Sequence, residues 1–269
     1  MSFTLPVAAI PDIKTPEEFT LRSYRSFDTF ESHVAACRKK LGMPMPGAWY
    51  EEPSFHFSNA DGLYGDGRKI SAPAHSHELD FGLGLGLVIG REGRNIPVEK
   101  AWEYIFGFTI INDFTARDLE RFEAPLGIGP SKCKDFATAV GPEIVPWQAV
   151  RDAINEEDRL ALKMEARVNG QSYSTGNGAD MHYSWTELVA HASRDATLYP
   201  GDLLGSGTMN RGSIMELDPQ TVAGWLQPGD VVELEVIRLG VLHSSIVSHD
   251  GTDEDAPSSQ ETRSASATR

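Results

Sequence analysis

The chain has 269 residues, 40% of them hydrophobic and 23% charged, which is enough to bury the core of one large domain. A formal net charge of −15 at pH 7 excludes a general affinity for nucleic acid, because such binding requires clustered Lys and Arg. Two cysteines and the lack of an apolar run of about 18 residues also exclude a disulfide framework and a membrane-spanning helix.

The first part of the chain, residues 1–23, is predicted to be a proline-punctuated lead-in with one short strand at residues 19–21. It lacks the basic start and the apolar core of a signal peptide. We therefore expect a cytoplasmic protein.

A helix is predicted over residues 26–42, because the apolar side chains of this stretch share one helical face and its last residue is a glycine. Asp28 and Glu31 have the spacing of a capping box. His33 lies at the edge of the apolar face, one turn before Cys37. On spacing alone, a partly buried structural histidine is the favoured interpretation of His33.

The stretch from residue 79 to residue 90 alternates apolar residues with others at period two, which predicts a strand with one buried face. The opposite face carries Gly82, Gly84 and Gly86 in succession. Glycine inside a strand costs roughly 0.5–1 kcal/mol relative to alanine, so three together indicate close approach of a ligand or of another backbone. A phosphate-binding loop is not favoured, because the strand continues where a helix would have to begin. We interpret the glycine face as the bare floor of a pocket.

The other elements are short apolar stretches separated by turn residues, which is typical of a β-rich α+β fold with few helices. They are a loop with short strands (44–73), an amphipathic helix (97–107), strands (108–111, 144–147 and 160–168), a hairpin turn (168–171), a short helix (185–191) and two turns followed by strands (199–208 and 226–237). From residue 248 onward hydrophobic residues disappear, and residues 250–269 are predicted to be a disordered acidic tail.

Several stretches occur in the order found in the fumarylacetoacetate hydrolase superfamily. They are the glycine-rich strand, Asn112–Asp118 (Asn-Asp-Phe-Thr-Ala-Arg-Asp), Lys132–Phe136 (Lys-Cys-Lys-Asp-Phe), Leu198–Thr208 with its Pro-Gly-Asp and Gly-Thr, and Gly212–Leu217. The chain resembles this superfamily over roughly residues 24–247. The resemblance implies a mixed β-roll with a few peripheral helices, a catalytic domain over residues 24–249, a small-molecule substrate and a homodimer.

The resemblance also implies a metal site, from which this chain departs. Members bind Mg²⁺ or Ca²⁺ through carboxylates that grip the two oxygens of a 1,3-dicarbonyl substrate. The Glu-x-Glu positions of that site match Gly82 and Gly84, and an upstream Asp position matches Ser26. Asp113 is the carboxylate that remains. Because a hard divalent cation requires about six oxygen ligands, several of them anionic, we expect no metal cofactor and treat Asp113 as a vestigial ligand at most.

The acid–base residues of the superfamily are retained. The resemblance implies that His33, paired with Glu216, activates water or moves a proton, and that Lys134 stabilises an oxyanion or carbanion. The alternative for Lys134 is a structural salt bridge to Asp135 or Asp113. The resemblance further implies substrate-binding positions, which are Tyr50, Gly82, Gly84, Arg117 and Thr208. Arg117 is also compatible with holding the Asp113 loop in place.

An intact acid–base set beside an emptied metal site leads to one main hypothesis: an enzyme of metal-independent keto–enol chemistry on a small β-dicarbonyl or β-keto acid. Hydrolytic carbon–carbon cleavage, decarboxylation, dehydration and isomerisation all fit this chemistry. Two alternatives stay open. The protein is a non-catalytic or degenerate small-molecule binder, or it is an Mg²⁺-dependent hydrolase whose metal site was inactivated by the glycines.

Overall fold

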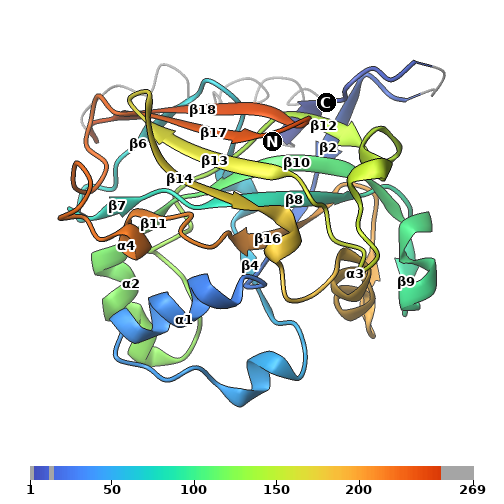
Figure 1. The fold of residues 1–269 in the computed structure, drawn as a ribbon, viewed down its shortest axis with the longest axis horizontal. Coiled ribbons are helices and arrows are strands. Elements are labelled where there is room, and N and C mark those ends of the chain that lie inside the picture. The colour runs from blue at the N-terminus through green and yellow to red at the C-terminus, as the bar shows by residue number, and fades with distance from the viewer. Residues whose placement is uncertain (1–2, 12–14, 250–269) are drawn as a thin grey trace, which may run out of the picture.

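The computed structural model describes residues 3–11 and 15–249, so the predicted acidic tail at 250–269 lies outside the described residues. Two large sheets and four helices dominate this part of the chain (Figure 1). The larger sheet has the order β4 (Phe55–Ser58), β3 (Ser23–Phe27), β16 (Asp202–Thr208), β8 (Leu83–Ile89), β10 (Ile105–Asp113), β12 (Thr138–Pro146) and β5 (Leu63–Tyr64). The second sheet has the order β14 (Gln171–Asn177), β13 (Lys163–Val168), β17 (Val231–Val236), β18 (Gly240–Val247) and β6 (Lys69–Ser71).

Three short strand pairs and the helices complete the fold. The pairs are β1 (Phe3–Pro6) with β2 (Glu18–Leu21), β7 (Leu79–Asp80) with β11 (Thr115–Ala116), and β9 (Gly93–Arg94) with β15 (Thr197–Leu198). The helices are α1 (Glu31–Lys40), α2 (Arg117–Glu123), α3 (Trp185–Ser193) and α4 (Ile214–Leu217). The predicted β-rich α+β class is therefore confirmed.

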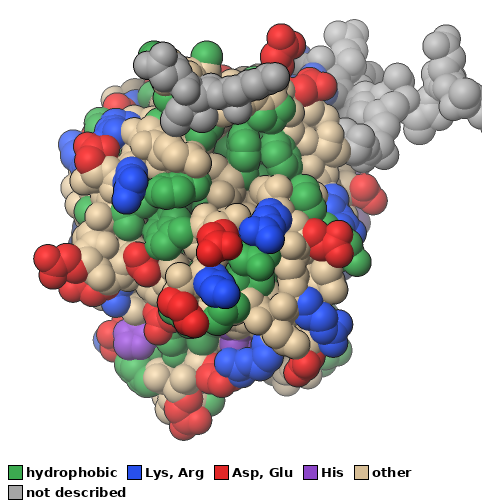
Figure 2. Space-filling model, turned by 90° about the vertical axis from the view of Figure 1, so that its right-hand side faces the viewer, with side chains coloured by type: hydrophobic (Ala, Val, Ile, Leu, Met, Phe, Trp, Pro, Cys, Tyr) green, Lys and Arg blue, Asp and Glu red, His purple; other side chains and the backbone are tan. Residues whose placement is uncertain are grey.

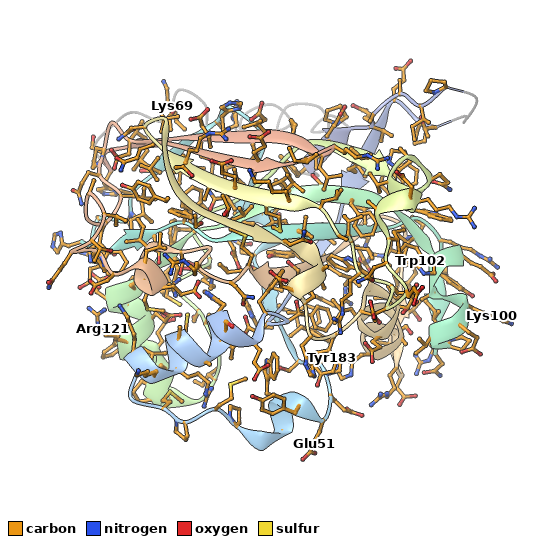
Figure 3. The ribbon with its side chains drawn as sticks, viewed as in Figure 1. Glu51, Lys69, Lys100, Trp102, Arg121 and Tyr183 are labelled. Carbon is orange, nitrogen blue, oxygen red and sulfur yellow. The ribbon has the colours of Figure 1, made fainter. Side chains whose placement is uncertain are left out.

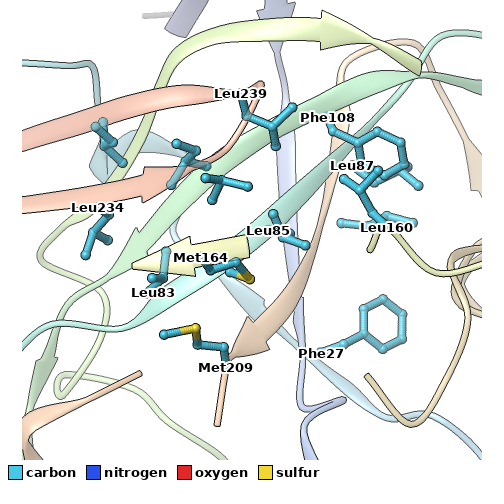
Figure 4. Packing of buried hydrophobic residues seen from close by; sticks show 14 of the residues in the cluster. Phe27, Leu83, Leu85, Leu87, Phe108, Leu160, Met164, Met209, Leu234 and Leu239 are labelled. Atoms are coloured by element: carbon cyan, nitrogen blue, oxygen red, sulfur yellow. The ribbon is translucent and has the colours of Figure 1, made fainter. Parts of the chain in front are cut away.

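The core lies between the two large sheets, where leucines of β8 meet apolar side chains of β13 and β17 (Figure 4). Met164 and Leu234 come from the second sheet and are fully buried against Leu83 and Leu85 of the first. In β17 buried residues alternate with more exposed ones, as predicted for a strand with one buried face.

The strand β8 differs from the prediction, because all of its residues are buried on both faces. A second apolar cluster covers the face opposite the main core, and the hairpin of β1 and β2 contributes Leu5 and Leu21 to it. The predicted strand at residues 19–21 is confirmed as part of β2. The lead-in thus supplies side chains to the core, which its weak sequence pattern did not indicate.

Two predicted helices are shorter than expected. Helix α1 begins at Glu31, because residues 23–27 form β3, which pairs in parallel with β16. The predicted capping box at Asp28 is wrong, since the residue that caps α1 is Phe30. The stretch predicted as a helix over residues 97–107 forms one 3₁₀ segment, Val98–Glu103, and the chain then enters β10.

Other local predictions are confirmed. The helix predicted at residues 185–191 is α3, and Ser184 and Glu187 form a capping box at its start. The hairpin turn between β13 and β14 uses Asn169 and Gly170, both with positive φ.

The segment of residues 44–54, which precedes β4, extends from the body on one side, where α1, α2 and α4 also gather (Figure 1). It is tied down by Tyr183, whose Oη donates a 2.7 Å hydrogen bond to the backbone oxygen of Trp49. Figure 3 shows Tyr183 above the segment that carries Glu51.

The surface gives two general findings. On the face that Figure 2 shows, acidic and basic side chains are intermingled. Within the described part of the chain, none of the helices has the length and apolarity needed to cross a membrane.

Candidate active site

A cavity of about 320 Å³ lies beside α1 and α2, at the ends of β3, β10 and β16. It brings together residues that are far apart in the sequence, among them Ser26, His33, Asp113, Arg117, Lys134 and Thr208. Tyr50 lies outside this cavity with 47% of its surface exposed, and its Oη donates a 2.6 Å hydrogen bond to Glu31 Oε1. The cavity is the candidate active site.

The closest polar contact at this site joins α1 to α4. Nδ1 of His33 lies 2.6 Å from Oε2 of Glu216, and the two side chains are only 10% and 4% exposed. Glu216 is itself held, because its Oε1 accepts a 2.9 Å hydrogen bond from the backbone N–H of Arg211. A carboxylate in this place fixes the imidazole orientation and favours its protonated form.

Burial by itself lowers the pKa of His33, but the contacts with Cys37 and Glu216 outweigh it and raise the pKa from 6.5 to about 10. The histidine therefore holds a proton at neutral pH. In this state His33 is suited to act as a general acid, which donates a proton, and not as a general base.

A buried carboxylate that the sequence reasoning missed, Asp80, anchors the helix that carries Glu216. Asp80 accepts hydrogen bonds from the backbone N–H groups of Ile214 (2.7 Å) and Met215 (3.1 Å), at the start of α4. It also accepts a 2.9 Å bond from Nε of Arg117. The sequence does contain an indication of this role, because Asp80 is a single carboxylate between the apolar residues Leu79 and Phe81. A carboxylate in such a stretch is buried only when it is paired with a hydrogen-bond donor or a cation.

Arg117 is engaged on both sides of its guanidinium group. Besides the bond to Asp80, its Nη1 donates to both carboxylate oxygens of Glu120, at 2.8 and 3.0 Å. These contacts favour a structural role in holding the loop after Asp113 over direct contact with a substrate.

Asp113 is surrounded by hydrogen-bond donors from three elements. Thr138 donates to Oδ1 (3.1 Å), and Ser26 and Lys134 both donate to Oδ2 (3.3 Å each). Nζ of Lys134 also donates a 2.7 Å bond to Oγ1 of Thr115. Burial lowers the pKa of Lys134, but the charge of Asp113 outweighs it and the net shift is upward, so the lysine stays charged.

The two glycines in the superfamily's Glu-x-Glu positions are covered by backbone. A Cβ atom at Gly82 would lie 2.7 Å from the carbonyl oxygen of Asp113, and one at Gly84 would lie 2.5 Å from that of Gly207. The expectation of a bare pocket floor is thus wrong, because the backbone of Asp113 at the end of β10 lies against Gly82 and that of Gly207 in β16 lies against Gly84. Of the two reasons for the glycines, close approach of another backbone is the one that applies.

The residues present do not fit a resident divalent cation. Four carboxylates line the cavity, Asp28, Asp113, Glu120 and Glu123, but Asp113 is paired with Lys134 and Glu120 with Arg117. In residues 3–11 and 15–249, no cluster of three or more His, Cys, Asp or Glu side chains has a geometry that could hold a metal ion. An octahedral oxygen site needs several anionic ligands, which this arrangement does not offer.

Comparisons with known proteins identify the family and agree with the fold. A family model described as fumarylacetoacetate (FAA) hydrolase C-terminal matches residues 22–247. The chain is 33% identical over 202 residues to an uncharacterized protein of Pyrococcus abyssi, covering 74% of this chain and 82% of that protein. It is 34% identical over 169 residues to the oxaloacetate tautomerase YisK of Bacillus subtilis, covering 63% of this chain and 52% of YisK.

A second curated relative and a solved structure extend the comparison. Human mitochondrial oxaloacetate tautomerase FAHD2A is 30% identical over 216 residues, covering 80% of this chain and 64% of that protein. The crystal structure of fumarylpyruvate hydrolase from Pseudomonas aeruginosa in complex with Mn²⁺ and pyruvate has the same fold, with a TM-score of 0.71 at 21% identity. It covers 92% of this chain and 96% of that one. The chain belongs to the fumarylacetoacetate hydrolase family, a family of enzymes.

Proposed function

We propose that this protein moves a proton between carbon and oxygen of a small β-dicarbonyl or β-keto acid, through His33 and Glu216 and without a resident metal. The observation that carries the proposal is the 2.6 Å contact between His33 Nδ1 and Glu216 Oε2, beside a cavity that Lys134 also lines. A buried carboxylate–imidazole pair next to a fixed ammonium group is an acid–base set with an anion stabiliser.

The protonation state of His33 gives it the role of general acid when the enol is converted to the ketone. With a pKa of about 10, the imidazole carries a proton at neutral pH. It can therefore deliver that proton to the α-carbon of a bound enol while the enol hydroxyl releases its own proton to solvent, and the neutral imidazole regains a proton from solvent. In the reverse reaction the neutral imidazole removes the proton from the α-carbon. Glu216 stabilises the imidazolium and sets the ring orientation.

Lys134 is suited to stabilise the enolate that forms when the α-carbon is deprotonated. Its ammonium group is anchored by Asp113 and Thr115, so little reorganisation is needed when negative charge develops on the substrate oxygen. One such donor is worth roughly 2.7–4 kcal/mol in the transition state. Thr208 lines the same cavity and offers a hydroxyl group to a substrate carboxylate.

Keto–enol proton transfer asks less of this site than hydrolysis does. Hydrolysis requires an activated water and stabilisation of a tetrahedral oxyanion, a task for which a metal ion supplies several kcal/mol. Proton transfer requires one acid–base group and one cation near the enolate oxygen. The names of the two oxaloacetate tautomerases among the relatives support the same choice and make oxaloacetate the first substrate to test.

The test follows the ultraviolet absorbance of the enol form of oxaloacetate after it is added to buffer with and without the protein, in the presence of EDTA. We expect the protein to accelerate enol decay and to do so equally with and without EDTA. Loss of the acceleration in EDTA would overturn the metal-independent mechanism. Binding without acceleration, seen as thermal stabilisation by oxaloacetate, would instead identify a non-catalytic binder.

A further inference from the structure

The described residues hold a thiol that the proposed reaction does not use, directly beside the acid–base pair. Cys37 lies one helical turn after His33 on α1, with Sγ 3.4 Å from Nε2 and 3.8 Å from Nδ1 of the imidazole. Because the two distances are so similar, the sulfur lies over the face of the ring and not in line with either nitrogen. The in-plane direction at Nε2 is thus left available for a substrate.

The environment of this thiol is that of a reactive cysteine. Cys37 is half-buried and lines the cavity that also contains Lys134. The ring of His33 lies within 4 Å of this sulfur, and Glu216 holds the ring by its 2.6 Å contact with Nδ1. The nucleophile, its cationic partner and the carboxylate that orients this partner therefore meet at one cavity wall.

The second cysteine of the chain offers a contrast within the same molecule. Cys133 is fully buried, and burial together with a hydrogen bond to Glu123 raises the pKa of its thiol to about 12. A buried thiol of this kind is inert toward electrophiles. Both cysteines line the cavity, but they differ in burial and in the nearest ionisable side chain, which is His33 for Cys37 and Glu123 for Cys133.

We propose that Cys37 is a nucleophile that adds reversibly to α,β-unsaturated keto acids bound in this cavity. The thiol proton leaves to solvent, and the sulfur forms a bond to the β-carbon of the substrate. The carbon–carbon π electrons shift to the carbonyl oxygen, where Lys134 stabilises the enolate. His33 then donates its Nε2 proton to the α-carbon, which completes a thioether, and the reverse steps release the acid.

Conjugate addition fits the site better than attack on the carbonyl carbon. A thiolate is a soft nucleophile, and addition at the β-carbon produces an enolate, for which the charge of Lys134 is already in place. Attack on the carbonyl would instead require donors arranged around a tetrahedral oxyanion. Because free rotation about the former double bond is possible in the adduct, the reaction would also interconvert cis and trans isomers. This activity goes beyond the proton transfer proposed above and does not depend on it.

The first experiment measures alkylation of the wild-type protein by iodoacetamide, with each cysteine followed by peptide mass spectrometry. The reference is the same protein unfolded in urea, where both thiols react at their ordinary rates. In the native protein we expect Cys37 to react at least about tenfold faster than in the unfolded chain, and Cys133 to be protected. Native reaction at Cys37 equal to or slower than in urea would overturn the proposal.

The second experiment uses trans-4-oxo-4-phenyl-2-butenoate, an α,β-unsaturated keto acid, as the electrophile. We expect a single adduct on intact protein, located at Cys37, absent in Cys37→Ser and slower by about tenfold in Glu216→Gln. The matched control is Glu31→Gln, which alters an exposed carboxylate on α1, the helix that carries Cys37. This variant should leave the rate unchanged. An adduct at Cys133, or an unchanged rate in Glu216→Gln, would overturn the proposal. Both readouts are independent of oxaloacetate turnover, so their failure is distinguishable from failure of the proposed function.

Discussion

Two of the ion pairs beside the cavity, His33–Glu216 and Lys134–Asp113, differ in what surrounds each carboxylate. Glu216 contacts His33 at 2.6 Å, and its charge keeps a proton on a group that can release it. Asp113 contacts Lys134 at 3.3 Å and is also saturated by hydroxyl donors from Ser26 and Thr138. The first pair is arranged for proton transfer, whereas the second fixes a positive charge in place.

The comparison shows how one carboxylate position can serve different purposes. The resemblance assigns Asp113 to a cation site, and here the ammonium group of Lys134 lies 3.3 Å from its carboxylate. At the positions of two further superfamily carboxylates, Gly82 and Gly84, the space for a side chain is filled by the backbone of Asp113 and of Gly207 in β16. Glu216, by contrast, stands at the position that the resemblance predicts. Its helix α4 is held by Asp80, which accepts a hydrogen bond from the backbone of Ile214 and another from Arg117.

The largest effect is expected from the first pair. His33→Gln should lower the rate of oxaloacetate enol decay by about 10²–10⁴-fold, because it removes the group that carries the proton. Glu216→Gln should lower it by a smaller factor, since the imidazole remains but loses its charge partner. Rates are measured by ultraviolet absorbance. His243→Gln is the control, because His243 lies on β18 of the second sheet, its side chain is 45% exposed and it pairs with Asp66. Full activity in His33→Gln would contradict the comparison.

The second pair should matter through its cation. Lys134→Gln is expected to lower the same rate by about 10²–10³-fold, the loss of one anion-stabilising donor. Lys132→Gln provides a matched control two residues away, because the Lys132 side chain is 73% exposed and pairs with Asp135. Equal rates in both variants would mean that Lys134 serves only to neutralise Asp113.

A third prediction concerns the two glycines at the Glu-x-Glu positions, Gly82 and Gly84. Gly84→Glu should reduce the free energy of unfolding by about 1–3 kcal/mol or more, because its Cβ meets the carbonyl oxygen of Gly207. Gly47→Ala is the control, since a Cβ there meets nothing within 4 Å. Urea unfolding measures both. Calorimetry of the Gly82→Glu, Gly84→Glu double variant should detect no Mn²⁺ binding, and tight binding would restore the hypothesis of an inactivated metal enzyme.

The smallest expected effect is on stability as a function of pH. The folded-state pKa of His33 is raised from 6.5 to about 10, so its stabilisation is fully present below pH 6.5 and is lost as the pH rises toward 10. Between these limits, wild type should lose at least about 1.4 kcal/mol relative to His33→Gln, which corresponds to one pKa unit. Urea unfolding of both proteins at pH 6 and pH 10 measures this difference. Parallel curves would show that the pair does not stabilise the fold.

Local sequence patterns predicted the elements whose structure depends on nearby residues. The capping box at Ser184 and the turn at Asn169 and Gly170 form as the sequence indicates, because their hydrogen bonds join residues close in the chain. The stretch at residues 23–27 was predicted partly as helix and is a strand. Its parallel pairing with β16 joins segments about 180 residues apart, and no local pattern contains that information.

The sequence by itself determined the fold class and the family, since alternation, turn residues and the motif at Asn112–Asp118 are properties of the chain order. It also named His33, Glu216 and Lys134 as candidates. The tertiary structure alone decided that backbone fills the glycine face, that Asp80 anchors α4 and that Cys37 lies over the imidazole ring. The first two depend on distances between segments remote in sequence, which are set by how the sheets and helices pack around the cavity. The third joins residues one helical turn apart and depends on the side-chain orientations that this packing imposes.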